Sequence, residues 1–194
     1  MRIVLIGFGT VGQGLAELLV GTRAALARDH GFDGVVVGIA DMLKGSCYDA
    51  RGLDLARALE IVGRGESLSS WHGAGRDWDA LGMIAQAEAD TVVELTYTDI
   101  KTGEPATSHV RAALEGGRHV VTTNKGPLAL HYRELAALAR AKGVRFLFEG
   151  TVMSGTPLLN LLRETLAGSD VTEVRGILNG TTNYILTQME AGQS

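Results

Sequence analysis

The chain has 194 residues, of which 18 are Lys or Arg and 22 are Asp or Glu, so its formal net charge is −4. With 45% hydrophobic and 21% charged residues it has the composition of a folded globular protein, which excludes a disordered chain. The acidic balance argues against a nucleic-acid partner, the apolar runs are too short to span a membrane, and one cysteine, Cys47, excludes a disulfide framework.

Short apolar runs alternate with longer amphipathic stretches over the first 148 residues. The apolar runs predict strands at residues 3–6, 35–40, 91–95, 119–122 and 144–148. The stretches between them predict helices at residues 11–27, 53–61, 79–87, 107–115 and 130–142. Strands that alternate with helices indicate βαβ units, and continuously apolar strands suit a sheet covered on both faces. The predicted fold class is therefore α/β, with a doubly wound parallel sheet.

The alternation of strand and helix patterns is interrupted after Glu149. A turn-rich segment leads to Pro157, and the pattern then predicts a helix at 158–166, a strand at 171–178 and a helix at 183–191. We therefore expect one domain over residues 1–150 and the beginning of a second, α+β domain over residues 151–194. About 44 residues rarely fold alone, so we expect this second domain to be incomplete.

A glycine pattern joins the first predicted strand to the first predicted helix. Residues 7–12 read Gly-Phe-Gly-Thr-Val-Gly, the G-x-G-x-x-G spacing in strand–turn–helix context. The first glycine permits the tight turn, the second lets the backbone approach a pyrophosphate, and the third lets the helix pack closely. The pattern predicts a Rossmann-type, dinucleotide-binding domain over residues 1–150, against the alternative of a merely tight turn. The expected cofactor-binding residues here are Gly7, Phe8, Gly9, Thr10, Val11 and Gly12.

Two residues after the second predicted strand bear on the choice of cofactor. Asp41 lies 29 positions after Gly12, farther than the usual ~20, but it is the candidate for the ribose hydroxyls and would favour NAD. Lys44 could instead meet a 2′-phosphate and favour NADP. An ordinary turn role for Asp41 is the alternative, so the sequence leaves NAD and NADP both open.

Polar residues also follow the next two predicted parallel strands. Ligands of open α/β sheets bind at the carboxyl ends of the strands. Thr96 is therefore expected near the nicotinamide ribose, with strand-end capping as the alternative. Lys125, in the run Asn-Lys-Gly-Pro, could bind a carboxylate or polarise an oxygen, and a solvated loop lysine is equally compatible with the spacing.

Taken together, these motifs resemble the homoserine dehydrogenase family in order and spacing over essentially the whole chain. The most specific are the last two, because many dinucleotide-binding proteins share the first. The matching segments are residues 7–12, 94–96, 102–106, 120–127, 149–157 and 176–186.

The resemblance implies an NAD(P)-dependent oxidoreductase that interconverts L-homoserine and L-aspartate 4-semialdehyde by hydride transfer, in threonine, methionine and isoleucine biosynthesis. It places Lys125 at the junction of cofactor and substrate, as the candidate catalytic residue. It implies two further sets of site residues, one lining the substrate pocket and one holding a sodium ion through backbone carbonyls, for which a plain interdomain hinge is the alternative. The substrate set is Asn179, Gly180, Thr181 and Thr182, and the sodium set is Glu149, Val152, Ser154 and Thr156.

The chain departs from the family because it stops at Ser194. The family continues with a substrate-binding glutamate, an aspartate, the lysine assigned to proton transfer and much of a homo-oligomeric interface. We therefore expect cofactor binding with little or no turnover. A different Rossmann dehydrogenase acting on an amino-acid-derived carbonyl and a non-catalytic NAD(P)-binding module remain alternatives. The start of the chain has no signal-peptide pattern, so a cytoplasmic location is expected.

Overall fold

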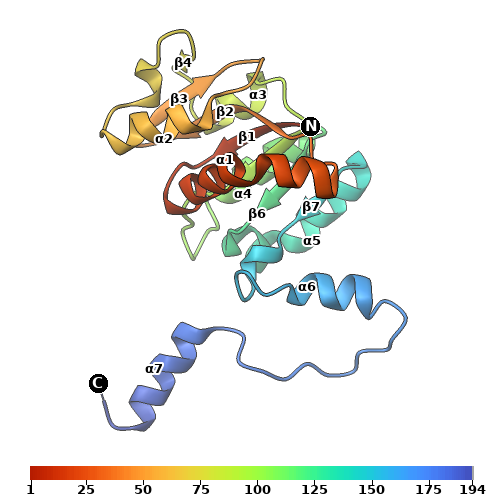
Figure 1. The fold of residues 1–194 in the computed structure, drawn as a ribbon. Helices are drawn as coiled ribbons and strands as arrows, with labels where there is room; N and C mark the ends of the chain where they lie inside the picture. The colour runs from red at the N-terminus through yellow and green to blue at the C-terminus, as the bar shows by residue number, and fades with distance from the viewer. Residues whose placement is uncertain (194) are drawn as a thin grey trace. The chain divides into compact units, whose positions relative to one another are not determined.

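The computed structural model describes residues 1–193 and divides into two compact units, one from Met1 to Leu147 and one that begins at Phe148. The first unit is a seven-stranded sheet with helices on both faces (Figure 1). Its strand order is β4-β3-β2-β1-β5-β6-β7. The strands are β1 (Arg2–Ile6), β2 (Val35–Asp41), β3 (Gly45–Tyr48), β4 (Gly75–Arg76), β5 (Thr91–Glu94), β6 (His119–Thr122) and β7 (Phe146–Leu147).

The sheet has a parallel core and an antiparallel edge. Strands β2, β1, β5, β6 and β7 pair in parallel, which confirms the predicted doubly wound α/β fold. Strands β3 and β4, which the sequence analysis did not predict, add antiparallel pairs beyond β2. The chain turns directly back after Asp41 because its carboxylate accepts the N–H groups of Leu43 and Lys44, an Asx-type turn that starts a hairpin.

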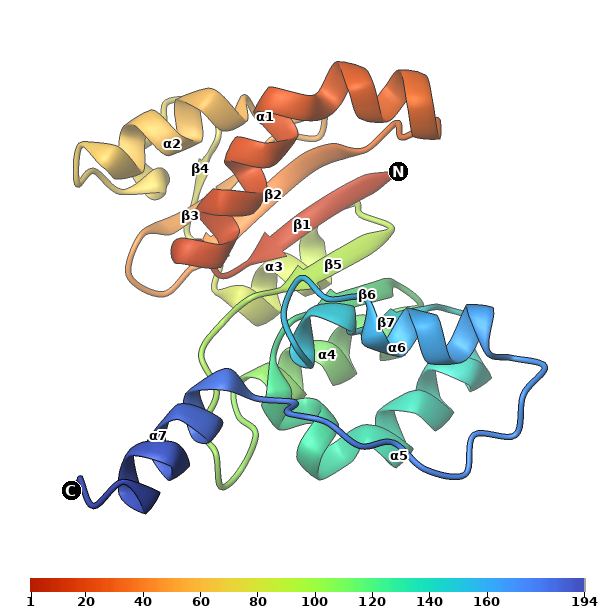
Figure 2. The ribbon, with the colours of Figure 1, turned by 60° about the horizontal axis from the view of Figure 1, so that its bottom comes forward.

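Five helices cover the two faces of this sheet. They are α1 (Thr10–His30), α2 (Leu55–Gly63), α3 (Ala80–Gln86), α4 (Ala106–Glu115) and α5 (Lys125–Lys142). Helices α1 and α2 pack together on one face, and α3, α4 and α5 cover the other (Figures 1 and 2). Helix α5 begins at Lys125 and not at residue 130 as expected, because the Asn124 side chain caps it by accepting the Gly126 N–H at 3.3 Å. Lys125 therefore lies in the first turn of a helix and not in a loop.

The register of the parallel strands brings their carboxyl ends to one level. Ile6 of β1 lies opposite Ala40 and Glu94, and Glu94 lies opposite Thr122. The chain leaves all four strands just beyond this row, so the residues that follow them gather at one edge of the sheet. In this row, Ile6 on β1 and Ala40 on β2 are apolar, whereas Glu94 on β5 and Thr122 on β6 are buried polar side chains.

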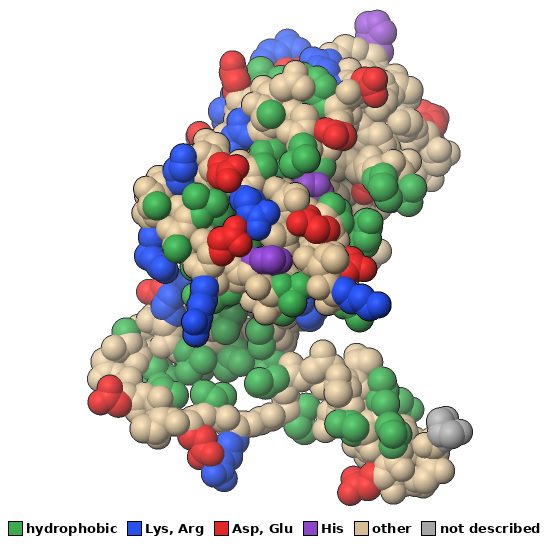
Figure 3. Space-filling model, turned by 180° about the vertical axis from the view of Figure 1, so that it is seen from behind, with side chains coloured by type: hydrophobic (Ala, Val, Ile, Leu, Met, Phe, Trp, Pro, Cys, Tyr) green, Lys and Arg blue, Asp and Glu red, His purple; other side chains and the backbone are tan. Residues whose placement is uncertain are grey.

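The second unit contains little regular structure. It has a 3₁₀ turn at Glu149–Thr151, the short helix α6 (Leu158–Asn160) continued by a π-helical turn (Leu161–Thr165), and helix α7 (Gly180–Glu190). The predicted strand at 171–178 is wrong, because among residues 1–193 no strand pairs with this segment and a strand needs a partner for its backbone groups. Apolar side chains of α7 are more than half exposed (Figure 3): Tyr184, Ile185, Leu186 and Met189. None of the helices in the described chain has the length and apolar character that a membrane span needs.

Cys47 lies on β3 in the core of the first unit and is fully buried. Burial disfavours the thiolate and raises the pKa of Cys47 to about 12, so at pH 8 about 10⁻⁴ of the thiol is ionised. We expect a thiol reagent such as DTNB to leave the folded protein unlabelled at pH 8 and to label one thiol per chain in guanidinium. Rapid labelling without denaturant would show that the β3 edge opens locally.

Candidate functional site

Two cavities open at the carboxyl edge of the sheet in the first unit. The Asp41 cavity has a volume of about 450 Å³, and its wall includes Gly7, Gly9, Asp41 and His109. The Lys125 cavity has a volume of about 380 Å³, and its wall includes Val11, Asn124 and Lys125. Leu95 and Thr96 line both cavities, so this strand end stands between them.

The glycine turn between β1 and α1 leaves no room for side chains at two of its three glycines. Gly7 has φ +98°, and a Cβ there would lie 2.7 Å from the carbonyl carbon of Leu95. A Cβ on Gly12 would lie 2.5 Å from the Gly7 carbonyl oxygen. A Cβ on Gly9 would meet nothing within 4 Å, so the missing side chain there leaves open space beside the backbone. These are the roles that the G-x-G-x-x-G spacing predicts.

The N-terminus of α1 has the character of an anion-binding site. Gly9 is its N-cap and makes no side-chain capping hydrogen bond, unlike the N-caps of α2, α3 and α5. The N–H groups of Thr10 and Val11 in the first turn therefore have no partner in their own helix, and the helix dipole adds positive potential. The side-chain amide of Gln13 donates to the Phe8 carbonyl at 2.9 Å, which holds the turn from behind. A phosphate or pyrophosphate matches this arrangement.

Asp41 holds the same turn from the end of β2. Its Oδ2 accepts the N–H of Phe8 at 2.7 Å, and its Oδ1 accepts the N–H groups of Leu43 and Lys44 at 2.9 and 3.0 Å. Burial raises the pKa of Asp41, but these backbone donors together with the Lys44 charge outweigh it and lower the pKa below its usual value. The amide of Phe8 is thus bound to Asp41, while Oδ2, which accepts one N–H, keeps one acceptor position on a residue that lines the Asp41 cavity.

The two candidates for cofactor choice are placed differently. Asp41 lines the cavity, together with Met42 and Leu43. Lys44 is half-buried next to Asp41 and is not one of the residues that form the cavity wall. Asp41 therefore has direct access to a ligand in this cavity, and Lys44 would have to extend its side chain to reach one.

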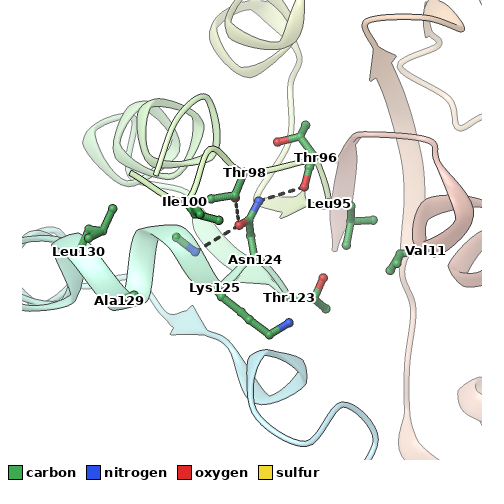
Figure 4. A pocket seen from close by; sticks show the side chains of 11 residues that line it. Val11, Leu95, Thr96, Thr98, Ile100, Thr123, Asn124, Lys125, Ala129 and Leu130 are labelled. Atoms are coloured by element: carbon green, nitrogen blue, oxygen red, sulfur yellow. Dashed lines mark hydrogen bonds between the residues drawn. The ribbon is translucent and has the colours of Figure 1, made fainter. Parts of the chain in front are cut away.

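The Lys125 cavity is organised by Asn124 (Figure 4). Its side-chain amide donates to the Thr96 carbonyl at 2.9 Å, and its oxygen accepts from the Thr98 hydroxyl and the Gly126 N–H. Lys125 extends away from this group of contacts and is exposed. The lysine charge and the N-terminus of the 18-residue helix α5 both favour a negatively charged ligand here.

The predicted substrate and sodium residues lie in the second unit. Asn179 caps α7 by accepting the Thr182 N–H at 2.8 Å, with Gly180 and Thr181 in the first turn of that helix. The Glu149 carboxylate accepts the N–H groups of Leu159 and Asn160 at 2.9 Å each.

The turn that carries the other three carbonyl candidates, Val152, Ser154 and Thr156, has an unusual backbone. Met153 and Ser154 both have positive φ, 58° and 51°. Among the carbonyls, that of Thr156 already accepts the N–H of Leu158 at 2.8 Å.

Sequence reasoning missed several polar residues in the cavity walls or behind them: Gln13, Glu94, Thr122, Asn124 and His109. Glu94 and Thr122 could have been found, because each is a polar residue that ends an otherwise apolar strand at the ligand-binding edge. His109 carries no comparable pattern. It lies within a helix and meets the site only through packing.

Comparison with known proteins gives one consistent family. The model of the homoserine dehydrogenase NAD-binding domain matches residues 7–149, and the homoserine dehydrogenase model matches residues 157–194. A homoserine dehydrogenase of Methanocaldococcus jannaschii is 42% identical over 190 residues, and an NAD(+)-dependent homoserine dehydrogenase of Pseudomonas canavaninivorans is 44% identical over 191. Each alignment covers 98% of this chain but only 56% and 54% of the relative, so the chain spans about half the length of these curated relatives.

Solved structures agree in fold. A hyperthermophilic archaeal homoserine dehydrogenase in complex with NADPH superposes with a TM-score of 0.82 at 31% identity, over 100% of this chain and 57% of that one. A homoserine dehydrogenase from Thermoplasma acidophilum gives a TM-score of 0.81 at 27% identity, again over 100% and 57%.

The steric argument for Gly12 predicts a loss of both stability and ligand binding on substitution. We expect Gly12→Ala to push α1 away from β1, to lower Tm by several degrees and to abolish saturable NADH binding, measured by nicotinamide fluorescence. Gly14→Ala is the matched control on the same helix. Its Cβ would meet nothing within 4 Å, so helix propensity should make it neutral or stabilising by up to about 1 kcal/mol. Equal behaviour of the two variants would contradict the packing role of Gly12.

The lowered pKa of Asp41 predicts a pH-dependent contribution to stability. The contribution is fully present above the unfolded-state pKa of about 3.9 and is lost as pH falls through the lower folded-state pKa. Asp41→Asn cannot accept the Phe8 N–H with its amide nitrogen, so we expect it to cost about 1 kcal/mol at pH 7. Urea unfolding should show that the difference in unfolding free energy between the wild type and Asp41→Asn becomes smaller below about pH 4. Asp33→Asn, the same change at an exposed position, should show no such narrowing, and a pH-independent Asp41→Asn effect would refute the assignment.

Proposed function

The chain belongs to the homoserine dehydrogenase family, and from this premise we propose that its first unit binds NAD or NADP across the two cavities at the carboxyl edge of the sheet. The observation that carries the proposal is the uncapped N-terminus of α1, which presents free backbone N–H groups beside the open space at Gly9. A pyrophosphate is the part of the dinucleotide that this turn fits.

The two cavities then take the two nucleoside halves. The Asp41 cavity fits the adenosine half, with the free acceptor position of Asp41 available to a ribose hydroxyl. The Lys125 cavity fits the nicotinamide half, with Thr96 at its boundary and Lys125 at its exposed side. When bound, the cofactor supplies or accepts the hydride. The protein residues bind and orient it, and Lys125 is placed to attract a carboxylate or polarise an oxygen of a small-molecule ligand.

For the complete reaction we propose the interconversion of L-homoserine and L-aspartate 4-semialdehyde, which the resemblance to the family implies. The pathways it would serve are threonine, methionine and isoleucine biosynthesis in the cytoplasm, and assembly into homo-oligomers is the expectation from the family. The 194 residues match only about half of each relative, so we propose cofactor binding with little or no turnover for these residues alone. Asn179, Gly180, Thr181 and Thr182 are proposed to hold the amino-acid part of the substrate.

The turn at residues 149–156 is proposed as a sodium site. Carbonyl oxygens suit a hard monovalent cation. Two consecutive residues with positive φ, Met153 and Ser154, redirect the neighbouring carbonyls and so allow several to face one point. The proposed ligands are the carbonyls of Glu149, Val152, Ser154 and Thr156. The Thr156 carbonyl would keep its hydrogen bond to Leu158 and use its second lone pair.

A two-stage titration tests the cofactor proposal. We expect NADH or NADPH to bind the purified chain saturably, and homoserine with the oxidised form of the tighter cofactor to give little or no turnover. Absence of binding by both would overturn the proposal, and clear turnover would overturn the claim that these residues do not suffice.

In the same titration, the Lys44→Ala variant tests whether Lys44 contributes to the preference for NADPH over NADH. If Lys44 reaches a 2′-phosphate, the variant binds NADPH about threefold or more weakly and NADH unchanged. Lys142→Ala, at the opposite end of α5 from Lys125, is the control for loss of one positive charge and should change neither affinity.

A further inference from the structure

The carboxyl group of Glu94 is fully buried at the end of β5, the strand between β1 and β6, and the proposed function assigns it no role. Burying a polar group in a core costs free energy unless its hydrogen bonds are satisfied. The aligned positions on β1 and β2, Ile6 and Ala40, are apolar, so the fold itself does not require a carboxyl group at this level. A departure from an apolar core is expected where function demands it.

Both oxygens of this carboxyl group are used. Oε1 accepts the backbone N–H of Thr96 at 3.0 Å and also the Thr96 hydroxyl. Oε2 lies 3.0 Å from the Thr122 hydroxyl, which is shared with the Glu94 carbonyl at 3.1 Å. Glu94 therefore contacts the residue that lines both cavities and also the end of β6.

These contacts close into a ring. The Asn124 N–H donates to the Thr122 hydroxyl at 3.0 Å, and the Asn124 side-chain amide donates to the Thr96 carbonyl at 2.9 Å. Glu94, Thr96, Asn124 and Thr122 thus form a hydrogen-bonded ring, called here the Glu94 ring. It joins the loop after β5 to the N-cap of α5, and Lys125 is the next residue. The two walls of the Lys125 cavity are held together by this ring.

Glu94 also lies near His109, a residue in the wall of the other cavity. The His109 Nδ1 lies 3.8 Å from Glu94 Oε1, and it is buried without a hydrogen-bond partner among the described residues. His109 lines the Asp41 cavity. The separation between Glu94 and His109 is longer than a hydrogen bond, so the hydrogen bonds of the Glu94 carboxylate go only to Thr96 and Thr122.

We propose that Glu94 is a positioning residue for the nicotinamide ring of the cofactor. It sets the spacing between Thr96 and Asn124, and thereby the shape of the Lys125 cavity, without touching the ligand. The inference rests on the proposed cofactor site. The adenosine half and the pyrophosphate depend instead on Asp41 and the glycine turn, which the ring does not include.

Glu94→Gln tests the proposal because it keeps the shape and replaces one acceptor oxygen by a donor. We expect NADH to bind about tenfold more weakly, typical for loss of a buried polar contact, and ADP-ribose, which lacks the nicotinamide ring, to bind as to the wild type. If NADPH is the tighter cofactor, the pair becomes NADPH and 2′-phospho-ADP-ribose. Hydrogen exchange of the Thr96 and Asn124 amides should also accelerate.

Thr91→Val is the matched control on the same strand. The Thr91 hydroxyl is buried and has no partner among residues 1–193, so its removal should change neither affinity nor the exchange of these two amides. If Glu94→Gln does not fold, Thr122→Val is the alternative variant for testing the ring. It removes the hydroxyl that links Glu94 Oε2 to the Asn124 N–H, and it should weaken NADH binding about threefold with ADP-ribose unchanged.

The outcomes separate the two proposals. Equal weakening of NADH and ADP-ribose, or unchanged binding of both with unchanged amide exchange, would overturn the positioning role and leave cofactor binding intact. If the wild type binds neither ligand, the proposed function fails. In that case the hydrogen-exchange rates of the Thr96 and Asn124 amides test the Glu94 ring by themselves. Faster exchange in Glu94→Gln but not in Thr91→Val supports the ring, and unchanged exchange refutes it.

Discussion

The close approach of two backbones, at Gly7 and Leu95, is the constraint on which the rest of the first unit depends. Strand β1 lies between β2 and β5, and the chain that leaves β1 must pass directly against the end of β5. A Cβ on Gly7 would lie 2.7 Å from the Leu95 carbonyl carbon and oxygen, so only glycine allows this path. The same path requires Gly12, whose missing side chain lets α1 pack onto the turn. The position of the α1 N-terminus at the edge of the sheet follows from these two contacts.

The helix ends then divide between structure and ligand binding. Helices α2, α3 and α5 begin at the side-chain caps Asp54, Asp79 and Asn124, each of which accepts one N–H of the first turn. Helix α1 has no such cap, and Asp41 instead ties down the amide of Phe8 next to it. The uncapped N–H groups of α1 are the donors that the proposed pyrophosphate would meet. Asp41 at the end of β2 and Asn124 after β6 have comparable roles, since Asp41 shapes one cavity and Asn124 the other.

Local patterns predicted most elements of the first unit and the helical segments of the second unit, but they failed for the predicted strand of the second unit. Hydrophobic runs located β1, β2, β5 and β6 because strands buried on both faces are continuously apolar. The pattern failed at residues 171–178, where a β-rich sequence stays irregular because no partner strand is present in the described chain. It also missed β3 and β4, which are short and polar and exist through pairing at the edge of the sheet. A β-strand requires hydrogen bonds to a partner segment, and the hydrophobic pattern of one segment does not show whether a partner is present.

By itself, the sequence determined the features that depend on a few consecutive residues: the glycine turn, the start of α1, and the placing of Asp41, Thr96 and Lys125 after strands. Backbone sterics and helix geometry act over that range, so spacing alone is sufficient. The tertiary structure alone decided which side chains meet. Phe8 and Asp41 are 33 positions apart and Glu94 and Thr122 are 28 apart, and each pair is joined by strand register and crossover direction. Register is set by packing of the whole sheet, which is why the Glu94 ring is visible in the structure and not in the sequence.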